Sequence, residues 1–120
     1  MNELRKLEKK VNGFEVLLSK YPEEAKKNKD GYIQDLEVLI DFIDDYIKFL
    51  SEKLQEWYSV NISIFEVTTT NIFFDVSKKI DTIIVEHYLK KYSKEMLKAE
   101  SLQKRLKVIE KRFMQFKYFS

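Results

Sequence analysis

The chain has 120 residues, a length that suits a single domain. Charged residues make up 35% of it and hydrophobic residues 44%, so it is too apolar for a disordered tail and too charged for a membrane-embedded protein. Two glycines and one proline argue against turn-rich β-folds and phosphate loops, and the lack of cysteine excludes disulfides, zinc fingers and thiol catalysis. We therefore expect a soluble, mostly helical protein.

The first predicted helix covers about residues 2–21. It should end near Tyr21, because the residue before a proline, here Pro22, is pushed out of the α region. Pro22 and the acids after it suit the start of a short second helical turn, and residues 26–31 (KKNKDG) predict a loop. The apolar residues of the first helix recur at spacings of three and four, as in a coiled coil: Leu4, Leu7, Val11, Phe14, Leu18 and Tyr21.

The second predicted helix covers about residues 32–58 and has the most regular pattern in the chain. Its apolar stripe is wider than the seam that two helices bury, so we expect a third helix to cover it, either from this chain or from a second copy. The stripe consists of Ile33, Leu36, Ile40, Ile43, Ile47, Leu50, Leu54 and Trp57, and it is widened by Leu39, Phe42, Tyr46 and Phe49.

Residues 59–70 (SVNISIFEVTTT) are the one stretch that does not indicate a helix. Apolar β-branched residues alternate with polar ones, and three threonines follow, which is the pattern of a strand. A single strand without a partner leaves its backbone donors unpaired. We therefore expect an irregular or extended connector here, with a strand that pairs with another molecule as the alternative.

The third predicted helix covers about residues 71–118. Its stripe keeps spacings of three and four from Val85 to Phe116, apart from one doubled three between Ala99 and Leu102, which predicts a local bend or break. The fold class expected from these segments is all-α. The three main helices should form an elongated, antiparallel, coiled-coil-like bundle that is one domain over residues 1–120.

The charge of the chain is divided between its halves. Residues 1–60 carry 10 basic and 13 acidic side chains, whereas residues 61–120 carry 12 and 7. Basic residues repeat every seven positions along the last helix, which favours contact with single-stranded nucleic acid or with an acidic partner. The alternatives are a solvated surface, or pairing with the acidic second helix inside the chain. The candidate contacts are Lys91, Lys94, Lys98, Lys104, Arg105, Lys111 and Arg112.

The acidic side chains of the second helix could face a basic partner, and the candidate contacts are Asp35, Glu37, Asp41, Asp44 and Asp45. A metal site in a helical bundle needs Glu-x-x-His pairs, and the one histidine, His87, directly follows Glu86, so a solvated acidic face is the expected structure. His87 has no nucleophile at a recognisable spacing and neither glycine belongs to a phosphate-binding motif. We expect no enzyme activity, cofactor, metal or small-molecule substrate.

The expected function is that of a non-catalytic, regulatory interaction module that associates with its own copies and binds a protein partner through apolar helix faces. The alternative is a nucleic-acid accessory protein that uses the basic last helix. The first ten residues (MNELRKLEKK) lack the apolar core of a secretory signal, and no uncharged run approaches the roughly 18–20 residues that span a bilayer. We therefore expect a cytoplasmic protein that does not bind membranes.

Overall fold

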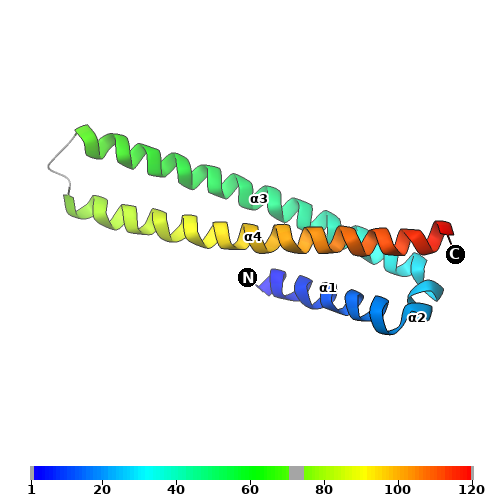
Figure 1. Cartoon of the computed structure of the whole chain (residues 1–120). Helices are drawn as coiled ribbons and strands as arrows, with labels where there is room; N and C mark the ends of the chain where they lie inside the picture. Colours follow the sequence, from blue (N-terminus) through cyan, green and yellow to red (C-terminus); the bar gives the residue numbers. More distant parts are fainter. Residues whose placement is uncertain (1, 71–74, 120) are drawn as a thin grey trace. The chain divides into compact units, whose positions relative to one another are not determined.

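The chain is helical throughout the part that its structure, a computed structural model, describes. This part covers the backbone of residues 2–70 and 75–119 and the side chains of residues 3–61 and 82–118. Within it, Tyr21 and Asn28 alone lie outside helices. The elements are α1 (Asn2–Lys20), α2 (Pro22–Lys27), α3 (Lys29–Thr70) and α4 (Asp75–Phe119) (Figure 1). The predicted all-α fold class is confirmed, and no strand occurs in the described ranges.

The helices form two compact units. The three-helix unit contains α1, α2, the part of α3 up to Tyr46 and the part of α4 from Lys98. The hairpin unit contains the remainder of α3 and α4, from Ile47 to Leu97. Two long helices are therefore shared between units that differ in the number of helices around their core.

The core of the three-helix unit is built from one apolar stripe of each long helix. The helix expected to cover the wide stripe of α3 is α1, which supplies four of the buried side chains. Ala25 of α2 is fully buried beside them. Because each stripe repeats at three and four residues, all three face a common axis. The buried apolar residues are Leu4, Leu7, Val11, Leu18, Ala25, Ile33, Leu36, Ile43, Ala99, Leu102, Leu106, Ile109 and Phe113.

Three aromatic rings join the helices of this unit at one level. Phe14 of α1 lies 5.9 Å from Tyr32 of α3 and 6.0 Å from Phe113 of α4, measured between ring centroids. Tyr32 and Phe113 are 5.6 Å apart. Pairs at these separations contribute about 0.5–1.5 kcal/mol beyond the area that they bury. The cluster therefore fixes the position of α1 along the bundle axis relative to the other two helices.

The hairpin unit has a sparser core. Among its described apolar side chains only Leu50 and Val85 are buried. Trp57 of α3 is half-buried, and its ring stacks on that of Tyr88 of α4 at 4.6 Å and 14°. Tyr88 in turn stacks on Tyr92 at 6.1 Å. Two helices held by a narrow seam and an aromatic stack leave their outer sides uncovered.

The connector predicted over residues 59–70 is wrong, because α3 continues through these residues to Thr70. The strand propensity of β-branched residues is a weak preference, whereas a helix that is already formed gains one hydrogen bond for each residue added. The residues Trp57, Val60, Ile64 and Val67 also repeat at helical spacings of three, four and three. Ser59 Oγ donates to the carbonyl oxygen of Gln55 at 3.0 Å, so its hydroxyl is accommodated within the helix.

Two further boundaries differ from the sequence prediction. The loop expected at residues 26–31 is reduced to Asn28, since α2 ends at Lys27 and α3 begins at Lys29. Of the bend or break expected between Ala99 and Leu102, the break does not occur, because α4 passes through these positions as one helix. At the N-terminal side the third predicted helix begins at Asp75, and residues 71–74 lie outside the described part. The first helix ends at Lys20, directly before Tyr21 and Pro22.

Candidate functional site

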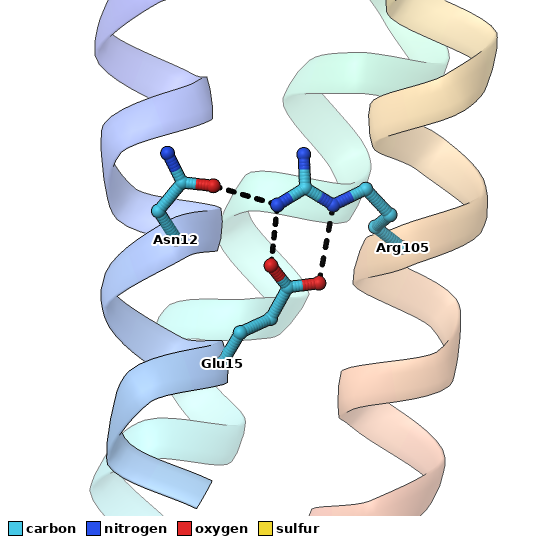
Figure 2. Close-up of polar contacts among 3 residues, drawn as sticks. All are labelled: Asn12, Glu15 and Arg105. Carbon is cyan, nitrogen blue, oxygen red and sulfur yellow. Dashed lines mark hydrogen bonds and ion pairs between the residues drawn. The ribbon is translucent and has the colours of Figure 1, made fainter. Parts of the chain in front are cut away.

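A line of charged contacts joins α1 to α4 in the three-helix unit. Arg105 Nε donates to Glu15 Oε2 at 3.1 Å, and Arg105 Nη2 donates to Glu15 Oε1 and, at 2.6 Å, to Asn12 Oδ1 (Figure 2). Two turns earlier along both helices, Lys98 Nζ lies 2.9 Å from Glu8 Oε2. Glu8 and Glu15 are seven residues apart, as are their partners, and they meet in the same order. The two helices therefore run parallel, in one heptad register.

These contacts change the protonation of the groups involved. The hydrogen bond that Arg105 donates to Glu15 lowers the pKa of Glu15 and raises the pKa of Arg105. The hydrogen bond from Lys98 likewise lowers the pKa of Glu8. The side chains are 35–43% exposed, so solvent screens the pairs and each stabilises the fold only modestly. Their main effect is to set the direction and register of α1.

The predicted basic stripe of α4 is divided by these contacts. Lys98 and Arg105 are bound to carboxylates of α1 and not to the acidic second helix, the internal partner that the sequence suggested. Lys104, Lys111 and Arg112 are exposed and form no ion pair with any described residue. They are the cations that the three-helix unit leaves open to a partner.

Two candidate cations lie in the hairpin unit. Lys91 Nζ is 6.0 Å from the ring centroid of Tyr88 and 5.9 Å from that of Tyr92, so it is drawn to the aromatic stack. Lys94 is exposed. The cations that repeat every seven residues therefore have three environments: some form ion pairs with α1, one lies beside aromatic rings, and the others are exposed to solvent.

The predicted acidic face lies on α3 within the three-helix unit. Asp35, Glu37, Asp41, Asp44 and Asp45 are all exposed. Gln103 Nε2 of α4 donates to Asp44 Oδ1 at 2.6 Å, which satisfies one carboxylate with a neutral amide. The other four form no ion pair with described residues. Most of the negative charge of α3 is thus left without an opposite charge in its own unit.

An open groove of about 570 Å³ lies between α1 and α3 on the surface of the three-helix unit. Apolar side chains form most of its walls, and one charged residue of each sign contributes to it. Val38, in its wall, is 68% exposed. The residues that line it are Lys10, Gly13, Phe14, Leu17, Tyr32, Asp35, Val38 and Leu39. A groove of this kind suits the side chains of another helix.

The hairpin unit presents a second apolar surface. Ile83 and Leu97 of α4, fourteen residues apart and therefore on one helix face, are 65% and 69% exposed. Against two buried apolar residues, this unit has six large exposed ones, among its described side chains: Phe49, Tyr58, Val60, Ile83, Ile84 and Leu97. We call these six the hairpin surface, which extends over more than one side of the hairpin because Phe49 and Tyr58, nine residues apart, lie on opposite sides of α3.

The described part of the structure also bears on metal binding, on the histidine and on membrane insertion. No group of three acidic or histidine side chains in the described ranges is placed to hold a metal ion. His87 is exposed, with its ring edge-on to Tyr88 at 5.4 Å. No helix offers, in its described residues, a stretch long and apolar enough to cross a membrane. Comparison of the chain with protein-family models, curated proteins and solved structures finds no match.

Sequence reasoning did not identify the residues of α1 that complete these surfaces. Glu8 and Glu15 share the seven-residue spacing of Lys98 and Arg105, and that shared spacing was the available signal. Lys10 and Gly13 carry no motif, and their position at the groove follows only from the packing of α1 against α3. The register between helices, which one sequence does not fix, decides which charges meet.

Proposed function

We propose that the chain is a non-catalytic helical interaction module that associates with its own copies and binds a protein partner through the hairpin surface. The observation that carries this proposal is the contrast between the two units. Six large apolar side chains are exposed in each unit, but thirteen apolar side chains are buried where α1 supplies a third helix, against two of the described ones in the hairpin unit. A helical partner on this surface would complete a bundle.

The energetics favour covering this surface. Complete burial of a Leu, Ile, Phe or Val side chain contributes about 1.5–3 kcal/mol, so covering one that is half exposed contributes about 1 kcal/mol. A partner that contacts more than one side of the hairpin, and so covers all six, offsets the loss of translational and rotational freedom on association, which is at least about 4 kcal/mol. The Trp57–Tyr88 stack joins α3 to α4 in the same unit.

Site-specific photo-crosslinking in the cells that make the protein tests this proposal. A photoreactive phenylalanine replaces Ile83 or Leu97 of the hairpin surface, and a matched control replaces Lys107, which is exposed on α4 of the three-helix unit. We expect one discrete adduct with a protein from both hairpin positions and none from the control. Adducts with the same pattern at all three positions, or none at either hairpin position, contradict the proposal.

A nucleic-acid accessory role is the second candidate, because Lys104, Lys111 and Arg112 remain open while Lys98 and Arg105 are paired with α1. The pairing reduces the number of cations available for phosphates, which makes this role weaker than the first. Binding of a fluorescent single-stranded oligonucleotide at two salt concentrations separates the two. A steep fall of affinity with salt that is lost in a Lys104→Glu, Lys111→Glu variant supports nucleic-acid binding, and absence of binding at low salt removes it.

A further inference from the structure

We propose that the groove between α1 and α3 is a self-association site, in which a second copy of this chain packs its own α1–α3 groove against the first, about a two-fold axis that runs along the groove. The inference rests on the self-association part of the proposed function. It concerns the three-helix unit, whereas the partner surface proposed above belongs to the hairpin unit.

The charges on the two sides of the groove have opposite signs. Lys10 of α1 and Asp35 of α3 both line it, and neither forms an ion pair with a described residue. Lys6, one turn before Lys10 and on the same side of α1, is also exposed. Because Glu8 and Glu15 are bound by α4, the outward charge of α1 is mainly positive.

This arrangement is complementary to itself in one orientation. An axis along the groove places α1 of one copy over α3 of the other, so that each Lys10 meets an Asp35 and the contact occurs twice. An axis across the groove would instead place α1 over α1 and bring like charges together. Charges of this kind choose the orientation of a complex more than they add affinity. The apolar wall, with Val38 68% exposed, supplies the area that is buried.

Gly13 is a second, independent indication of a close approach. It lies inside α1, where glycine weakens a helix relative to alanine. The chain itself gives no reason for glycine there: no described glycine has a positive φ, and a Cβ at position 13 would meet nothing within 4 Å. A missing side chain in the wall of a groove lets another helix approach closely. The second copy provides that helix.

The size of the face indicates a weak dimer. The 19 residues of α1 extend about 28 Å, and two helices side by side are about 20 Å wide, so each copy offers a face of roughly 550 Å². The total of roughly 1,100 Å² lies at the lower end of specific interfaces. Dissociation constants in the micromolar range are expected for such a contact.

The test uses charge reversals in the full chain, with native mass spectrometry as the readout. Lys10→Asp and Asp35→Lys each replace two attractive contacts with two repulsive ones, and we expect each to raise the dimer dissociation constant about tenfold. The two variants mixed together should form a heterodimer in preference to either homodimer, because both contacts are then attractive again. Lys107→Asp, an exposed change on α4, is the matched control and should dimerise like the wild type.

The outcomes are distinct. A wild-type chain that stays monomeric overturns the self-association in the proposed function and this site with it. A wild-type dimer that neither reversal weakens overturns this site alone. A Lys10→Asp variant that pairs with the wild type more tightly than the wild type pairs with itself overturns the orientation, because it indicates α1 over α1. A photoreactive phenylalanine placed at Val38 in the groove wall that crosslinks to a different protein, and not to a second copy, also overturns the site.

Discussion

Replacing Phe113 with alanine is the most direct perturbation of the three-helix core. The side chain is fully buried, and its ring contacts Phe14 of α1, Tyr32 of α3 and, at 5.8 Å, Phe116 of its own helix. Removal of a buried phenylalanine side chain generally lowers the free energy of unfolding by about 3–5 kcal/mol. Because three ring pairs are lost together, we expect about 4 kcal/mol, a large part of the 5–15 kcal/mol typical of a domain.

Urea denaturation followed by circular dichroism at 222 nm measures this loss. All variants are compared at one protein concentration, because self-association adds to apparent stability. Phe113→Leu keeps most of the volume and should lose about 1–1.5 kcal/mol. Tyr118→Ala, five residues further along α4 and 70% exposed, is the control and should change stability by less than about 0.5 kcal/mol. If Phe113→Ala loses no more than Tyr118→Ala, the helices do not meet at this ring and the described core is wrong.

Three further predictions follow from the same unit. Gly13→Ala should raise the free energy of unfolding of the monomer by about 0.5–1 kcal/mol, since the added methyl group meets no other atom and alanine favours the helix more than glycine does. An unchanged or lower urea midpoint at low protein concentration would show that position 13 is constrained within the chain. The free energy of unfolding should fall as the pH drops from about 6 to about 3, because the fold lowers the pKa values of Glu8 and Glu15. Their contribution is present above the ordinary pKa of 4.5 and is lost as the pH falls through the lowered pKa values. A variant with glutamine at both positions should lose less stability over that range. A double-mutant cycle of Glu15→Gln and Arg105→Met should give a coupling energy of about 0.5–1 kcal/mol in urea denaturation, and a value near zero would mean that solvent screens the pair fully.

Helical periodicity was enough to predict the fold class and most of the core. The stripes of α1, α3 and α4 recur at three and four residues, and the buried residues fall on them. Pro22 identified the end of α1, because its effect on the preceding residue is local and steric. These features depend on a few neighbouring residues, which is why one sequence reveals them.

The failures share a physical cause. Residues 59–70 look like a strand when taken alone, but they follow a helix that has already formed and they keep an apolar spacing that continues it. The break expected at Ala99 and Leu102 does not occur, since both residues are buried in the same core despite the irregular spacing. In each case packing and helix propagation outweigh a local preference of about 1 kcal/mol or less.

The candidate sites were predicted only in outline. The acidic and basic helices were evident from composition, but their partners depend on which helices are neighbours and in which direction they run. Lys98 and Arg105 bind α1, which leaves α3 acidic and α1 outwardly basic. The groove between α1 and α3 has no sequence signature, because its residues come from two separate helices and belong to no common motif.

The claim that this chain associates through helix faces left uncovered in the monomer is tested most directly by sedimentation equilibrium of the purified wild-type chain. Measured from about 1 to 100 μM, the weight-average mass should rise from that of the 14.5-kDa monomer toward twice this value, with a micromolar dissociation constant. A mass that stays at 14.5 kDa over the whole range would contradict it.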